Sequence, residues 1–182
     1  MPAVVSGEPR QTGAVRGLVL TGVYGTGKST LAEVIADALE DAGLAYAAID
    51  LDWLCWSSVA GGDDGEHTDV FYANVAAVVG NYVAAGVDHV VTALALRDRA
   101  ALGRLAGAFG FRPAVVQLSV PIGVISTRLA AAATDGRRQD AETAGRWLDD
   151  AVGAELGDLV VVNDRPVAEV AAEILDWLGW IG

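Results

Sequence analysis

The nine residues Gly22–Thr30, which read GVYGTGKST, decide the fold of this chain. They match the pattern G-x-x-x-x-G-K-[ST] of a phosphate-binding loop, or P-loop. The apolar run Gly17–Thr21 precedes them and indicates a buried strand, and a helical pattern of apolar residues follows from Ser29 to Asp41. Because the motif requires a strand before it and a helix after it, both neighbours support a true P-loop.

The rest of the chain continues the alternation of strand and helix. Short apolar runs predict further strands at 45–49, 87–93, 114–120 and 159–162. Helical spacing with glycine or proline boundaries predicts helices at 69–85, 98–108, 121–133, 141–151 and 167–178. Five strands joined by helices indicate an α/β fold, a parallel sheet with helices on both faces. The 182 residues fit one such domain at 17–182, behind a flexible N-terminal tail at 1–16.

The charge of the chain disfavours some classes of partner. There are 24 Asp and Glu residues against 12 Lys and Arg, a formal net charge of −12, which opposes binding to nucleic acid or to an anionic membrane. No apolar run approaches the roughly 20 residues that span a bilayer, and the N-terminus lacks the layout of a signal peptide. We therefore expect a cytoplasmic protein, monomeric or homodimeric, that binds neither nucleic acid nor membrane.

The cysteine and histidine content predicts neither a disulfide nor a metal centre of the zinc type. Cys55 is the single cysteine, and we expect it to be a buried apolar thiol. His67 and His89 are not spaced as metal ligands and have no cysteine partners.

The polar residues of the P-loop have predicted roles toward two cofactors, ATP and Mg²⁺. Lys28, the single lysine of the chain, would bridge the β- and γ-phosphates, Ser29 would ligate Mg²⁺, and Thr30 would lie near the α-phosphate. The backbone N–H groups that cradle the phosphates belong to the loop itself, whose members are Gly22, Tyr24, Gly25, Thr26 and Gly27. The alternative is a glycine-rich turn without chemical significance.

From Gly17 to Trp180 the chain resembles the small P-loop kinases, a family that includes shikimate, gluconate and adenylyl-sulfate kinases and chloramphenicol phosphotransferase. The resemblance is closest to actinobacterial ATPases and adenylyl-sulfate-kinase-like proteins. It is carried by the P-loop, Asp50-Leu51-Asp52, Arg128-Leu129 and Asn163-Asp164-Arg165-Pro166. It implies the strand order 2-3-1-4-5, a small lid at about 130–145, and transfer of the γ-phosphoryl group of ATP to a small molecule.

Asp50 and Asp52 are the predicted carboxylates of the site. They stand two residues apart at the end of the second strand, so strand alternation would project both from one side at the carboxyl edge of the sheet. Asp50 would hold a water bound to Mg²⁺, and Asp52 would orient the acceptor hydroxyl and accept its proton. The alternative is a pair of solvated loop aspartates.

Arginines are expected to complete the nucleotide site. By the resemblance, Arg128 would stack on adenine or touch phosphate, Arg137 would close over the γ-phosphate together with Arg138, and Arg165 and Pro166 would contact the nucleotide. The alternative for Arg137 and Arg138 is an exposed pair that serves solubility. Family members often carry a further arginine one turn after Arg128, where this chain has Ala131 and Ala132.

The acceptor class is argued from charge, because the stretch from Ser29 to Leu96 contains eleven carboxylates and no lysine or arginine. Such a stretch suits a hydroxyl on a neutral or cationic molecule, such as an aminoglycoside or another amino-bearing natural product. The expected acceptor residues are Trp53 and Trp56, which either line the pocket or pack under the loop, and an acidic loop with Asp63, Asp64, Glu66 and Asp69. Arg97 and Arg99 leave an anionic acceptor open, as in nucleotide or adenylyl-sulfate kinases.

Two other classes lack their motifs. A regulatory GTPase needs an N-K-x-D loop, which Asn163-Asp164-Arg165-Pro166 does not supply, and a transport ATPase needs a signature such as L-S-G-G-Q, which is absent. A non-catalytic nucleotide-binding module remains as an alternative to the kinase.

Overall fold

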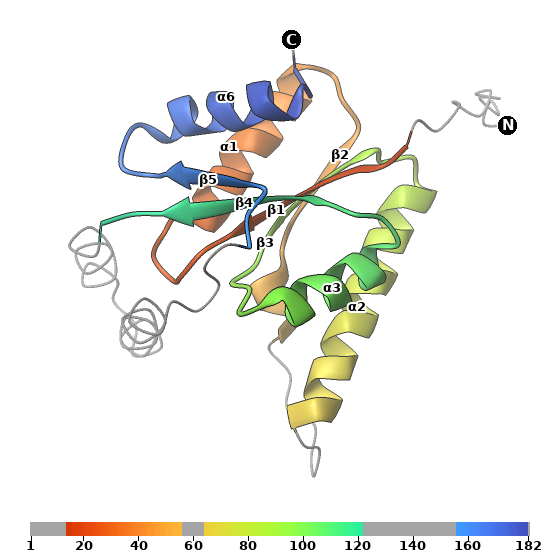
Figure 1. Cartoon of the computed structure of the whole chain (residues 1–182). Helices are drawn as coiled ribbons and strands as arrows, with labels where there is room; N and C mark the ends of the chain where they lie inside the picture. The colour runs from red at the N-terminus through yellow and green to blue at the C-terminus, as the bar shows by residue number, and fades with distance from the viewer. Residues whose placement is uncertain (1–13, 56–63, 122–155, 182) are drawn as a thin grey trace, which may run out of the picture.

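The computed structural model describes residues 14–55, 64–121 and 156–181, and it places five parallel strands in one sheet of order β2-β3-β1-β4-β5 (Figure 1). This confirms the expected order. The strands are β1 (Arg16–Thr21), β2 (Tyr46–Asp50), β3 (His89–Ala93), β4 (Ala114–Ser119) and β5 (Leu159–Val162). The central strand β1 pairs in parallel with β3 on one side and β4 on the other, so the P-loop leaves the middle of the sheet.

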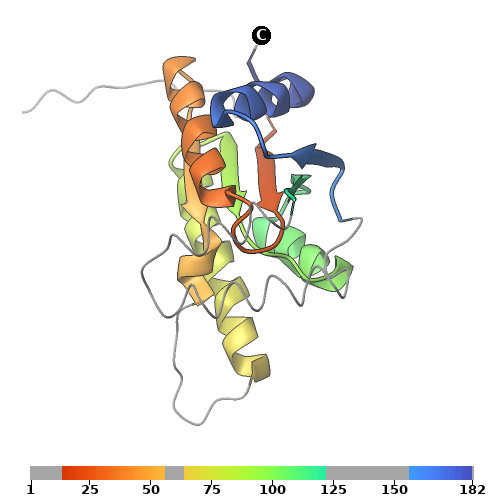
Figure 2. The same cartoon turned by 90° about the vertical axis from the view of Figure 1, so that its left-hand side faces the viewer.

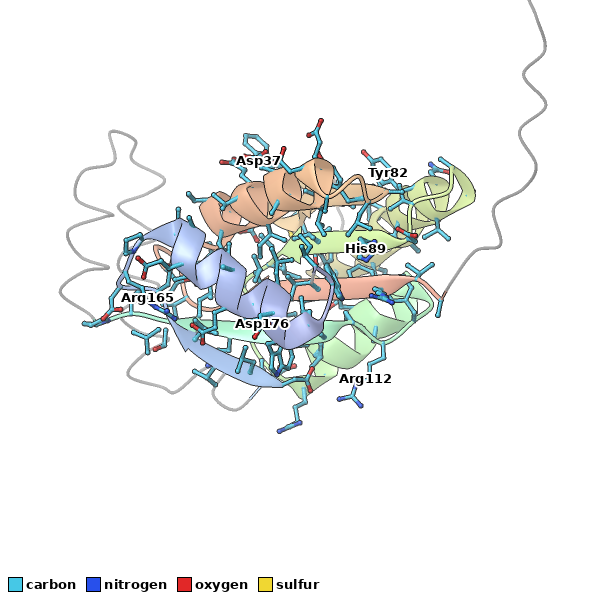
Figure 3. The ribbon with its side chains drawn as sticks, turned by 90° about the horizontal axis from the view of Figure 1, so that it is seen from above. Asp37, Tyr82, His89, Arg112, Arg165 and Asp176 are labelled. Carbon is cyan, nitrogen blue, oxygen red and sulfur yellow. The ribbon has the colours of Figure 1, made fainter. Side chains whose placement is uncertain are left out.

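Helices cover both faces of the sheet, as predicted. On one face lie α1 (Lys28–Asp41) and α6 (Val167–Leu178), and on the other lie α2 (Asp64–Ala84) and α3 (Arg99–Phe109) (Figure 1). Figure 3 looks onto the first layer and shows α1 and α6 side by side over the strands. None of the helices in the described part of the chain is long and apolar enough to cross a membrane.

Two apolar clusters, one on each face, hold these layers to the sheet. Alternation along β1 divides its side chains between them, since Leu18 and Leu20 pack toward α1 and α6 while Val19 packs toward α2 and α3. All three side chains are fully buried. Buried apolar side chains therefore hold β1, the strand that precedes the P-loop, on both faces of the sheet.

The structure corrects two element boundaries that matter for function. The second long helix begins at Asp64 rather than at 69, so Asp64, Glu66 and Asp69 belong to a helix and not to an acidic loop. Residues Leu51–Cys55 form a 3-10 helix, η1, directly after β2. The helices expected at 121–133 and 141–151 and the lid at about 130–145 lie outside the described residues, except that Pro121 is not helical.

Gly22, the first residue of the P-loop, has no room for a side chain. Its φ is +139°, and a Cβ built on it would lie 2.5 Å from the backbone oxygen of Leu118 on β4. We expect Gly22→Ala to lower the free energy of unfolding by at least about 3 kcal/mol, since backbone strain and a clash with backbone add together. Urea denaturation followed by circular dichroism measures this loss.

The matched control is Gly43→Ala. Gly43 also has a positive φ, +70°, but nothing lies within 4 Å of its added Cβ, so the expected loss is only about 1 kcal/mol. Equal losses in the two variants would show that the approach of β4 to the P-loop does not constrain Gly22.

Candidate active site

The candidate site lies at the carboxyl edge of the sheet, which faces the viewer in Figure 2, with the loop between β1 and α1 at its centre. Gly22, Gly25 and Gly27 all have positive φ values, of 139°, 83° and 88°. Residues that carry a side chain rarely adopt such φ values. Glycine is therefore needed at these three positions for the backbone of the loop to curve around a phosphate. Open parallel sheets bind their ligands at this edge.

Lys28 is fixed by the backbone of the loop that it follows. Its Nζ donates to the carbonyl oxygens of Gly22 at 3.1 Å and Val23 at 3.2 Å, and it lies 5.3 Å from the centre of the Tyr24 ring. The residue is only 6% exposed. The long side chain is thereby folded over the loop, which places its positive charge where the motif requires a phosphate.

Thr26 closes the turn of the loop from within. Its Oγ1 donates to the carbonyl oxygen of Val23 at 2.9 Å, and its backbone N–H donates to the same oxygen at 3.4 Å. The Thr26 side chain is almost completely buried. Thr30 lies exposed in the first turn of α1.

Ser29 and Asp50 meet across the gap between α1 and β2. The Ser29 hydroxyl donates to Oδ2 of Asp50 at 2.6 Å, although the two residues are 21 positions apart in the sequence. Hydroxyl and carboxylate oxygens are the hard donors that Mg²⁺ prefers. The described residues hold no cluster of three or more His, Cys, Asp or Glu suited to a metal. The hydroxyl of Ser29 and the carboxylate of Asp50 would supply two oxygens to such an ion.

Asp52 does not continue the strand of Asp50. Oδ1 of Asp50 accepts the backbone N–H of Asp52 at 3.1 Å and turns the chain into η1. The expectation that strand alternation projects both carboxylates is therefore wrong in its geometry, because the strand ends at Asp50. Both residues are still partly exposed at the carboxyl edge, separated only by Leu51.

Cys55 ends η1 as an exposed residue, and the expectation that it is buried is wrong. The thiol is nevertheless partly covered, and this partial burial, followed by the charges of Asp52 and Asp50, raises the pKa of Cys55 to about 11. The thiol is therefore protonated at neutral pH and is not a nucleophile there.

The residues expected around the acceptor are only partly brought together. Trp53 is 68% exposed, and the loop under which it was expected to pack lies outside the described residues. Asp69 of α2 forms an ion pair with Arg104 of α3, whose guanidinium also lies 4.3 Å from the centre of the Tyr72 ring. Arg97 is exposed after β3. Trp56 and Asp63 lie outside the described residues.

The residues after β5 take an arrangement that the sequence does not predict. Arg165 forms an ion pair with Glu173 of α6, and Pro166 precedes the first turn of that helix. Figure 3 shows Arg165 near the N-terminal end of α6. Arg128 and Arg137, the other arginines expected at the nucleotide, lie outside the described residues.

Sequence reasoning assigned no role to two polar residues that support the site, although one of them, Asn163, stands in a loop that carries the resemblance. Thr21, the last residue of β1, accepts the backbone N–H of Leu96 on its Oγ1 at 3.0 Å and ties the chain after β3 to the base of the P-loop. Asn163, directly after β5, donates from Nδ2 to the carbonyl oxygen of Thr26 at 2.7 Å. The structure shows that both residues are buried. The signal available in the sequence was a polar residue at the end of an apolar strand.

Comparison with known proteins gives the fold. No protein-family model and no curated protein matches the sequence. A sugar kinase from a Janibacter species has a TM-score of 0.66 at 20% identity, over 91% of this chain and 95% of that chain. The APS kinase of Mycobacterium tuberculosis, solved with AMPPNP and APS, has a TM-score of 0.63 at 19% identity, over 91% and 98%.

A third similar structure is the tunicamycin resistance protein of Deinococcus radiodurans. Its TM-score is 0.59 at 16% identity, over 91% of this chain and 96% of that chain. Two of these three structures are named as kinases. Their similarity extends over about nine-tenths of the chain, which therefore has the small P-loop kinase fold.

Proposed function

We propose that this chain, which has the fold of the small P-loop kinases, is an enzyme that transfers the γ-phosphoryl group of ATP to a hydroxyl of a small molecule. The observation that carries the proposal is the contact of Ser29 with Asp50 at 2.6 Å. It joins the first turn of α1 to the end of β2 and sets two oxygen ligands beside the P-loop. A glycine-rich turn without chemistry needs no such partner.

Each residue at this edge has a role in the proposed reaction. Ser29 and Asp50 would hold Mg²⁺, Asp50 through a bound water, and the ion supplies positive charge to the phosphate oxygens. Lys28 would stabilise the charge that develops on the β- and γ-phosphates. Asp52 accepts the proton of the acceptor hydroxyl as its oxygen bonds to the γ-phosphorus, the bond to the β-phosphate oxygen breaks, and ADP leaves.

The acceptor that we propose is neutral or cationic, with an aminoglycoside or another amino-bearing natural product as the candidate. The support is the stretch from Ser29 to Leu96 without lysine or arginine. One observation weakens this support, because Arg104 from α3 forms an ion pair with Asp69 and neutralises its charge. That one similar structure is named for resistance to tunicamycin is consistent with an antibiotic as the acceptor.

The second candidate function is a nucleotide or adenylyl-sulfate kinase. The similar structure solved with APS favours it, and Arg97 lies exposed after β3, near the carboxyl edge. A non-catalytic nucleotide-binding module is the third reading. Turnover of any acceptor excludes that module.

The experiment is a screen of ATP consumption against hydroxylated antibiotics, sugars and nucleosides, followed by a salt titration on the best acceptor. With ATP saturating, kcat/KM for a cationic acceptor should fall as ionic strength rises, since salt screens its attraction to Asp63 and to the carboxylates at the start of α2. The double variant Asp63→Asn/Asp64→Asn should raise KM more than it changes kcat.

The control is Glu33→Gln/Asp37→Asn, which removes the same charge from exposed positions on α1, across the sheet from α2. It should leave KM unchanged. A rise of kcat/KM with salt would reject the cationic acceptor and favour the adenylyl-sulfate or nucleotide reading. Absence of phosphoryl transfer to every acceptor would contradict the kinase itself.

A further inference from the structure

Asn163 connects the end of β5 to the P-loop past the carboxyl end of β4, the strand that lies between β5 and β1. Its backbone N–H donates to the carbonyl oxygen of Ser119 at 2.9 Å, which holds the residue against the end of β4. Its side-chain Nδ2 donates to the carbonyl oxygen of Thr26 at 2.7 Å. The residue is 4% exposed, so this is a buried bond between a fixed donor and the loop.

The bond sets the direction of one peptide group of the P-loop. In a planar trans peptide the C=O and the next N–H point in opposite directions, and the described residues contain no cis peptide. Holding the Thr26 carbonyl toward Asn163 therefore turns the Gly27 N–H to the opposite side. The next peptide is held as well, because the Gly27 carbonyl accepts the N–H of Leu31 in the first turn of α1.

A P-loop binds phosphate only when its N–H groups point inward and its carbonyls point away. A carbonyl turned toward the phosphates would repel them. Gly27 adopts a φ of 88°. Because a glycine can also adopt many other backbone conformations, the residue itself does not select the required peptide orientation. The side chain that selects it comes from a residue 137 positions away.

We propose that Asn163 is a positioning residue that orients the Gly27 amide toward the phosphates of the bound nucleotide. The inference rests on the proposed function, because it takes the P-loop to bind a nucleotide. It goes beyond that function by assigning part of the phosphate affinity to a residue outside the P-loop motif. A merely structural role predicts lower stability with unchanged affinity.

The test measures binding of ADP and of inorganic tripolyphosphate by isothermal titration calorimetry in the full chain. Asn163→Leu removes the donor without adding charge, and Asn163→Asp keeps the shape while replacing the donor with an acceptor. Both variants should bind both ligands at least about tenfold more weakly at pH 8. As pH is lowered to about 6, only Asn163→Asp should regain affinity relative to wild type, because a protonated carboxyl donates again.

The control is Gln117→Leu on β4. Gln117 also uses its side-chain amide on backbone, since its Oε1 accepts the N–H of Gly157 at 3.4 Å. Among the described residues its side chain forms no hydrogen bond with the P-loop. Its thermal stability should fall while both affinities stay within about twofold of wild type. If Asn163→Leu does not fold, Asn163→Asp across the pH range still tests the donor.

Two results would overturn the inference. One is an Asn163→Leu variant that binds tripolyphosphate as wild type does, whether or not it binds ADP more weakly. The other is an equal loss of affinity in Gln117→Leu. A wild-type protein that binds tripolyphosphate but phosphorylates no acceptor would instead contradict the proposed function, while the Asn163 comparison would still be decided by the binding data.

Discussion

Lys28→Met should lower kcat for phosphoryl transfer by at least about 10³-fold, because the transition state loses the positive charge beside its β- and γ-phosphate oxygens. The substitution keeps the aliphatic part of a side chain that is 6% exposed. It removes the two hydrogen bonds from Nζ to Gly22 and Val23. Steady-state kinetics on the best acceptor measures the loss.

The stability of the Lys28 variant has to be measured beside its activity. Two lost hydrogen bonds predict a moderate decrease in melting temperature, with the fold preserved. Circular dichroism and thermal denaturation report on this, and Lys28→Ala provides a second variant without the stem. A folded variant that keeps more than about a tenth of wild-type turnover would contradict the P-loop assignment.

Asp52→Asn should lower kcat by about 10²-fold to 10⁴-fold, because it removes the group that orients and deprotonates the acceptor hydroxyl. Its dependence on Mg²⁺ should stay that of wild type. Asp50→Asn should behave differently, since it loses an oxygen that bonds to Ser29 at 2.6 Å. It should raise the Mg²⁺ concentration needed for half-maximal rate as well as lower kcat.

The control for both aspartates is Asp37→Asn, the same chemical change at an exposed position on α1 (Figure 3). It should leave the rate and the metal dependence unchanged. If Asp50→Asn and Asp52→Asn behave like this control, then η1 and the end of β2 do not belong to the active site.

The charge pattern shows where sequence reasoning ended. The stretch from Ser29 to Leu96 contains no arginine. From this the sequence predicts an acidic region suited to a neutral or cationic acceptor, with Arg97 and Arg99 as the arginines that could compensate. Arg104 lies eight positions after that stretch in the chain, yet α3 packs against α2 and brings it to Asp69 and Tyr72. Counting charges along the chain cannot find such a pair, because packing of helices decides it.

The boundary errors have a local cause. The second long helix starts five residues earlier than predicted, at Asp64. Its first residues read DGEHT and have no apolar periodicity from which a helix could be predicted. At Asp52 the chain leaves the strand because the Asp50 carboxylate accepts its N–H. A hydrogen bond between a side chain and the backbone N–H two residues later competes with continuation of the strand. The alternation of apolar and polar residues in the sequence gives no sign of such a bond.

The sequence by itself determined the features that depend on neighbours along the chain. These are the strand before the P-loop, the helix after it, the glycines at positive φ and the apolar run that makes β1 a buried strand. Each of them follows from periodicity or from a contiguous motif, which a single sequence displays.

Tertiary structure alone decided which distant residues meet at the carboxyl edge. The contact of Ser29 with Asp50 and that of Asn163 with Thr26 join positions 21 and 137 apart. Parallel strands bring their carboxyl ends to one edge whatever their separation along the chain. The direction of a peptide group in the P-loop is thus set by a side chain that follows the last strand of the sheet, and only the folded chain shows this.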